Sequence, residues 1–263
     1  MIILAIYLLA LVTGLIGGFL GSLLGIGGGA FMVPILVLLG GLSVKVVAPA
    51  SLMAIMGTSI GGLLHLYKKK LVHLYYSITL GVSAIIGAAT GLELTEIAPE
   101  NTLRILLAST LVLSGIGLLS REKLEERKKH RKPEKTEVRR LLLACIAAYL
   151  GGIIAVLLGV GGGVINVPII VFLLGQPLHV AVATSKLIIG ITATSGTIGN
   201  AVKSLIDLQI ALPLLIGTYI GATVSSRILV KTPEKILRIL ASTYYYITAT
   251  ILVLEVIRNT TIH

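Results

Sequence analysis

The chain has 263 residues, of which 56% are hydrophobic and only 13% are charged, and its formal net charge is +11. A typical soluble domain carries roughly a quarter charged residues, so this composition excludes a disordered chain and a collagen-like fibre and disfavours a water-soluble enzyme. The single cysteine, Cys145, excludes an internal disulfide. We therefore expect an all-α, polytopic protein of the cell membrane.

Apolar segments follow one another along the chain in two sets of five. A full crossing needs about 20 residues, so four segments of each set can span a membrane, whereas the second segment of each set is too short. The first set covers residues 1–24, 30–42, 45–66, 73–92 and 102–119, and the second covers 139–158, 164–175, 179–200, 208–228 and 237–257.

The two sets are copies of one another. The stretch GIGGGAFMVPIL at 25–36 recurs as GVGGGVINVPII at 159–170, an offset of 134 residues. The same offset aligns Pro99-Glu100 with Pro233-Glu234, and Arg104 with Arg238. We interpret the chain as a duplication, with membrane repeats at 1–120 and 139–258 joined by a linker at 121–138.

Basic residues gather around the linker. Positions 121–140 hold 10 of the 22 Lys and Arg, so the net charge indicates a solvated cytoplasmic loop beside the bilayer and no nucleic-acid partner. Loop 67–73 is also basic, whereas loop 93–101 is acidic, which places these two loops on opposite sides of the membrane. In the second half the charge pattern reverses, which predicts an inverted-topology repeat with both termini outside.

The glycine triplets are the strongest local signal. Glycine lets a backbone leave helical geometry inside a bilayer, and each triplet opens a short segment that contains a proline. The free N–H groups of such a half-helix can bind an anion without a charged side chain. Tight helix packing is the alternative reading. The predicted substrate-binding glycines are Gly27, Gly28, Gly29, Gly161, Gly162 and Gly163, with Pro34 and Pro168 as structural residues.

Polar residues near the same depth complete the predicted site. Lys186 is the basic residue deepest in an apolar segment, and it either contacts an anion in a cavity or extends to the inner interface. Asn166 follows the second triplet and can offer amide donors. The hydroxyls either bind the ligand or bond their own helices. Those ranked as substrate-binding are Ser51, Thr58, Thr184, Ser185 and Thr192.

The residue pattern indicates neither a catalytic site nor a metal site. There is no convincing nucleophile–base arrangement and no His, Cys or carboxylate cluster with metal spacing, so we expect neither an enzyme nor a cofactor. The spelling Gly25-x-Gly27-x-x-Ala30 matches a dinucleotide fingerprint, but the preceding apolar stretch is too long for a strand and no acid follows at the required distance.

The doubled G-x-G-G-G…P element, the Thr184-Ser185-Lys186 segment and the basic linker resemble the sulfite exporter TauE/SafE family, the TSUP permeases. The resemblance covers essentially the whole chain. It implies a permease for small sulfur-containing or organic anions, such as sulfite, sulfoacetate or related sulfonates, driven by an ion gradient. Where the family has Thr-Ser, the first half has Ala50-Ser51, which departs from the pattern.

The function expected from these observations is secondary transport, with export the expected direction. The two repeats would rock about a midplane site that binds a small anion, with a proton or sodium as the coupling ion. A passive anion channel using the same helix ends is the first alternative, and a non-transporting membrane scaffold or accessory subunit is the second. The sequence leaves the oligomeric state open.

Overall fold

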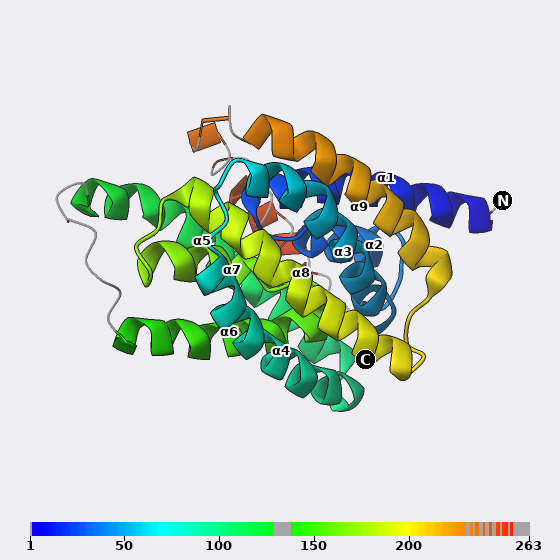
Figure 1. Ribbon diagram of the computed structural model, residues 1–263. Helices are drawn as coiled ribbons and strands as arrows, with labels where there is room; N and C mark the ends of the chain where they lie inside the picture. The colour runs from blue at the N-terminus through cyan, green and yellow to red at the C-terminus, as the bar shows by residue number, and fades with distance from the viewer. Residues whose placement is uncertain are drawn as a thin grey trace.

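The computed structural model describes residues 2–128 and 138–229, together with separate positions between 232 and 254. Within these residues all regular structure is helical, as predicted (Figure 1). The helices are α1 (Ile2–Leu24), α2 (Gly29–Leu38), α3 (Val44–Lys68), α4 (Leu74–Ile97), α5 (Glu100–Lys128), α6 (Val138–Leu158), α7 (Gly163–Phe172), α8 (Leu178–Val202) and α9 (Leu208–Leu229). Most of the predicted segment 237–257 and residues 129–137 of the predicted linker 121–138 lie outside the described residues.

Six of the described helices are long and apolar enough to cross a membrane, namely α1, α3, α4, α6, α8 and α9. Large apolar side chains such as Leu64, Ile86, Ile146 and Ile216 are exposed on their outer faces. Such a surface suits lipid, where an apolar side chain faces a solvent of its own kind. The prediction of a multi-pass membrane protein is confirmed.

The predicted helix breaks lie at the glycine triplets. The first break joins α1 to α2 and the second joins α6 to α7, and both half-helices are ten residues long. Gly28 and Gly162 cap the half-helices with φ of 92° and 70°, in the left-handed region that side chains with a Cβ rarely adopt. Pro34 and Pro168 lie inside the half-helices, as expected.

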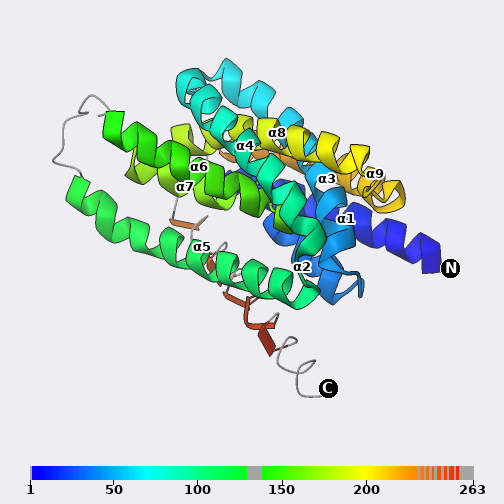
Figure 2. The ribbon, with the colours of Figure 1, turned by 90° about the horizontal axis from the view of Figure 1, so that it is seen from below.

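The long helices form two bundles that do not coincide with the two repeats. We call α1, α3 and α9 the first bundle and α4, α6 and α8 the second bundle (Figures 1 and 2). The bundles meet where α3 packs on α8. Each repeat therefore contributes two long helices to one bundle and one to the other, so α4 and α9 are exchanged between the repeats.

The two repeats run in opposite directions through the molecule. Along the contact between the equivalent helices α3 and α8, Leu52 lies beside Gly196, whereas Gly62 lies beside Lys186. Residue numbers therefore rise on one helix as they fall on the other, which makes the helices antiparallel. By contrast, α1 and α9 are parallel, because Gly14 lies beside Leu214 and Gly18 beside Thr218. This arrangement confirms the inverted-topology repeat.

The turn between α8 and α9 lies against the end of α4. Lys203 Nζ lies 2.7 Å from Glu96 Oε1 and 2.9 Å from Glu93 Oε1. Hydrogen bonds to Glu96 and then to Glu93 raise the pKa of Lys203 above its ordinary value. These ion pairs connect α8 and α4 of the second bundle at the end of the molecule opposite the linker.

Candidate functional site

The two glycine loops meet at the centre of the protein. A Cβ placed on Gly29 would collide with the carbonyl oxygen of Gly159, and a Cβ on Gly163 would lie 2.7 Å from the carbonyl oxygen of Gly25. Residues 25–30 and 159–164 are all buried. At Gly29 and Gly163 the two loops therefore pack so closely that neither position has room for a side chain.

Two serine hydroxyls fasten each loop to the opposite repeat. Ser51 Oγ donates a hydrogen bond of 2.8 Å to the carbonyl of Gly159. Its equivalent, Ser185 Oγ, donates one of 2.9 Å to the carbonyl of Gly25. Both serines are fully buried, so the hydroxyls satisfy carbonyls that the broken helices leave without an intrahelical donor.

Two equivalent isoleucines cover both loops. A Cβ on Gly27 would lie 3.1 Å from Ile189 Cγ2 and 3.5 Å from Ile55 Cγ2, and a Cβ on Gly161 would lie 2.9 Å from Ile55 Cδ1. Both isoleucines are buried. The predicted half-helix ends therefore converge, but they pack against apolar side chains in this conformation.

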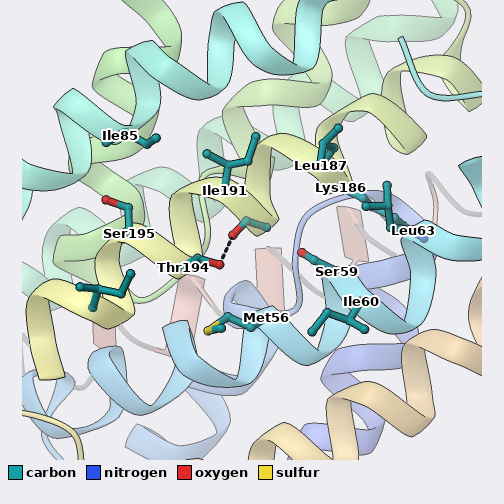
Figure 3. Close-up of a pocket in the computed structure, with 12 residues that line it drawn as sticks. Met56, Ser59, Ile60, Leu63, Ile85, Lys186, Leu187, Ile191, Thr194 and Ser195 are labelled. Carbon is teal, nitrogen blue, oxygen red and sulfur yellow. Dashed lines mark hydrogen bonds between the residues drawn. The ribbon is translucent and has the colours of Figure 1, made fainter. Parts of the chain in front are cut away.

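A groove begins at the next residue on each helix. It has a volume of about 570 Å³ and runs between α3 and α8, with Ile85 of α4 at its side (Figure 3). Met56 and Gly190 line it immediately after the two isoleucines. Most of the lining is apolar, and the polar exceptions are Ser59, Lys186, Thr194 and Ser195.

Lys186 is deeply buried and lies at one end of the groove, beside Leu63 (Figure 3). The residue is only 2% exposed, and its Nζ donates a hydrogen bond of 2.7 Å to Ser22 Oγ on α1. Gly62 makes room for it, since a Cβ there would lie 2.9 Å from Nζ. Of the two readings that the sequence left open for Lys186, this geometry fits the residue that lines a cavity.

The groove is lined by one basic side chain, which has no acidic partner among the described residues. Among the residues whose burial the structure describes, Lys186 is the one Asp, Glu, Lys or Arg in the buried class. No carboxylate of the described chain lies within ion-pair distance of it. A buried cation in a membrane protein is costly unless a counter-charge or a ligand accompanies it, so this position favours a negative solute.

The remaining predicted residues lie outside the groove lining. Thr192 donates to the Ile188 carbonyl of its own helix, and the Thr184 hydroxyl accepts from the backbone N–H of His73. Thr58 Oγ1 and Asn166 Oδ1 are buried and have no hydrogen-bond partner among the residues that the structure describes, and Asn166 packs on α6 at Gly151. Of the predicted substrate-binding residues, the groove lining includes Lys186 alone.

Sequence analysis missed the residues that surround Lys186. Ser22 and Gly62 were not candidates, although Ser22 is the direct acceptor for the ammonium group. The signal that could have found Ser22 is a difference between the two repeats. Equivalent positions are Leu52 for Lys186 and Val156 for Ser22, so a polar residue in one copy replaces an apolar residue in the other.

Broken helices that meet between two inverted repeats define the class of polytopic membrane transporters in which the site lies near the repeat interface. Comparison with known proteins supports the same class. The sequence pattern of the family described as Sulfite exporter TauE/SafE matches residues 10–252. The chain belongs to this family and is a membrane transporter.

Similar proteins carry transporter names. The chain is 26% identical to "Probable membrane transporter protein YunE" of Bacillus subtilis, a match that covers 89% of this chain and 93% of the relative. It is also 26% identical to "Probable membrane transporter protein MJ0441" of Methanocaldococcus jannaschii, over 84% of this chain and 86% of the relative. A "Probable membrane transporter protein" of Haemophilus influenzae is 31% identical, over 72% and 69% of the two chains. No solved structure matches the chain significantly.

Proposed function

We propose that this protein is a secondary transporter that exports a small sulfur-containing or organic anion, such as sulfite or a sulfonate. The observation that carries the proposal is Lys186, a buried basic side chain that lines a groove between the bundles, with a hydroxyl beside it and no acid within ion-pair distance among the described residues. A cation in this position lowers the free energy of an anion within the bilayer far more than it would in water.

The moving parts in this proposal are the two bundles rather than the two sequence repeats. The bundles touch along α3 and α8, and the groove lies on that contact. Rocking there would separate Ile55 from Ile189 and expose the glycine loops with their N–H groups. In that conformation the anion would accept hydrogen bonds from Ser51, Ser185 and the glycine N–H groups, which contact other parts of the protein in the present structure. The predicted binding residues would thus take part in the transport cycle.

Flux measurements test the proposal. Purified protein in proteoliposomes should move sulfite or a small sulfonate when a proton or sodium gradient is imposed. Lys186→Met keeps the side-chain length and removes the charge, and it should weaken anion affinity by about 10- to 100-fold, since a hydrogen bond to a charged group contributes about 1.5–3 kcal/mol. Leu52→Met at the equivalent position is the matched control and should transport normally.

The outcome separates the candidate functions. Anion flux that persists without any coupling ion and gives single-channel currents would establish the passive channel instead. Wild-type flux in Lys186→Met, or no flux of any tested anion by the wild type, would contradict the proposal.

A further inference from the structure

Two equivalent packing sites lie between the repeats, and one of them is apolar whereas the other is polar. At the apolar site, Leu52 of α3 and Ala88 of α4 pack with Val156 of α6, and Leu92 lies against them. Leu52 fits into a notch at Gly196, where a Cβ would lie 3.2 Å from Leu52 Cδ1. The side chains of this cluster are all apolar.

The equivalent site contains Lys186, Ser22, Ala222 and Ser226, with the notch at Gly62. Lys186 Nζ donates to Ser22 Oγ, and Ser22 Oγ donates at 3.4 Å to the carbonyl of Ala222. Because the equivalent packing site is filled by Leu, Val and Ala, packing alone does not require a basic side chain here. The charge therefore serves something that the fold itself does not supply.

A second buried polar residue lines the same groove. Ser59 lines the groove and is only 5% exposed, yet its Oγ has no hydrogen-bond partner in the described chain. Its equivalent in the other repeat is Ala193, which again shows that packing does not require the hydroxyl. A buried hydroxyl without a hydrogen-bond partner costs about 1–3 kcal/mol of stability, so a ligand that accepts a hydrogen bond from it would remove that cost.

The rest of the groove is mostly apolar, with Thr194 and Ser195 as further polar residues, and it is far larger than an inorganic oxyanion needs. Its volume of about 570 Å³ falls in the range of sites for organic molecules, and one water occupies only about 30 Å³. Away from Lys186 and Ser59 the lining consists mainly of aliphatic side chains, with Ile60, Ile191 and Ile198 among them. Ile60 and Ile198 are exposed on the outer surface, so the groove opens toward the lipid.

We propose that this groove binds an amphipathic organic anion, with its sulfonate or carboxylate at Lys186 and Ser59 and an aliphatic tail along the isoleucines. This inference deepens the proposed function and rests on it, because it assigns the substrate class of the same site. The apolar lining then contributes affinity that sulfite, which has no tail, does not gain.

A series of alkanesulfonates tests the tail. Methanesulfonate, ethanesulfonate and propanesulfonate carry the same head group, and their bilayer partitioning is slight. Each is measured by competition with radiolabelled methanesulfonate for purified protein in nanodiscs. A buried methylene contributes about 0.8 kcal/mol, so affinity should rise about fourfold per carbon and about sixteenfold across the series.

Variants locate the effect. Leu63→Trp fills the groove beside Lys186 and should remove the gain with tail length, and Met56→Trp is the second variant if the first fails to fold. Ile216→Trp adds the same bulk on an exposed face of α9 and should keep the full gain. Lys186→Met should weaken all three sulfonates to a similar degree.

Two failures are distinguishable. If methanesulfonate binds in a Lys186-dependent way but the longer tails add nothing, the amphipathic substrate is wrong and anion transport stands. If no sulfonate binds and none is transported, the proposed function itself fails. An equal gain with tail length in Leu63→Trp and in the wild type would assign the gain to the bilayer and overturn the inference.

Discussion

Two equivalent serines hold the centre of this transporter together, and each reaches across to the other repeat. Ser51 bonds the carbonyl of Gly159 and Ser185 bonds the carbonyl of Gly25. These carbonyls lie where the helix stops, so no N–H further along the chain is placed to satisfy them. In this conformation the two hydroxyls therefore act on the backbone of the protein.

Replacing either serine should destabilise the fold. Ser185→Ala leaves a buried carbonyl unsatisfied, which costs about 1–3 kcal/mol of unfolding free energy. Heating followed by fluorescence-detection size-exclusion chromatography should show a lower melting temperature for Ser185→Ala and for Ser51→Ala. Ser109→Ala is the control, because Ser109 is exposed and bonds only its own helix at Leu106. An unchanged melting temperature in both buried variants would show that these bonds are not needed.

Sequence reasoning identified Lys186 but could not determine its surroundings. Depth along a segment is readable from the chain, whereas the direction of a side chain depends on which helices pack around it. Ser22 is 164 residues from Lys186, and no periodicity connects the two. Four of the predicted hydroxyls, Ser51, Ser185, Thr58 and Thr192, are equivalent between the repeats, whereas the groove lies where the repeats differ.

At the scale of elements, glycine determines which helix faces approach closely. Gly152 of α6 lies against α4, where a Cβ would collide with the carbonyl oxygen of Ala84. Its neighbour Gly151 faces another way, and a Cβ there would lie 3.5 Å from the side chain of Ile165, an ordinary contact. Gly152 is thus needed for the close contact between α6 and α4, whereas Gly151 leaves room for a small side chain.

The adjacent glycines give a matched pair of substitutions. Gly152→Ala forces α4 and α6 apart and should cost about 1–3 kcal/mol, the usual range for overpacking. Gly151→Ala should be neutral or should stabilise by about 0.5–1 kcal/mol, because alanine loses less backbone entropy in a helix. Thermal stability of both variants in the same detergent checks this, and an equal loss in both would contradict the assignment of the α4–α6 contact.

Helix bounds followed from hydropathy and glycine more readily than contacts did. The segments predicted at 45–66 and 179–200 correspond to α3 and α8, and the short segments correspond to α2 and α7. At the other extreme, α5 continues to Lys128, past the predicted end at 119, because the charged residues that follow are still good helix formers. Hydropathy reports which segments enter a bilayer and carries little information on which of them pack together.

At the scale of the whole molecule, the exchange of α4 and α9 between the bundles determines at which end of the molecule each loop lies. Because α3 and α9 run parallel, the loop after Lys68 and the loop before Leu208 lie at opposite ends. The first loop is rich in lysine, so the positive-inside rule assigns it to the cytoplasm.

Cysteine labelling tests this orientation. In a Cys145→Ala background, an impermeant maleimide should label Asp207→Cys in intact cells and Lys69→Cys only after permeabilisation. Both positions are exposed and so differ in side rather than in reactivity. Labelling of both from outside would contradict the inverted repeat, and the reverse pattern would contradict the orientation alone.

The exchanged helices also have a consequence for biogenesis. Ser22 of α1 and Ala222 of α9 touch, although 200 residues separate them. A ribosome adds about 5–20 residues per second, so the first helix waits roughly 10–40 s for its main neighbour to be synthesised. During that interval the glycine-lined face of α1 must rest against lipid or an insertion factor, and a chain cut short before the ninth helix would leave this face uncovered for quality-control proteases.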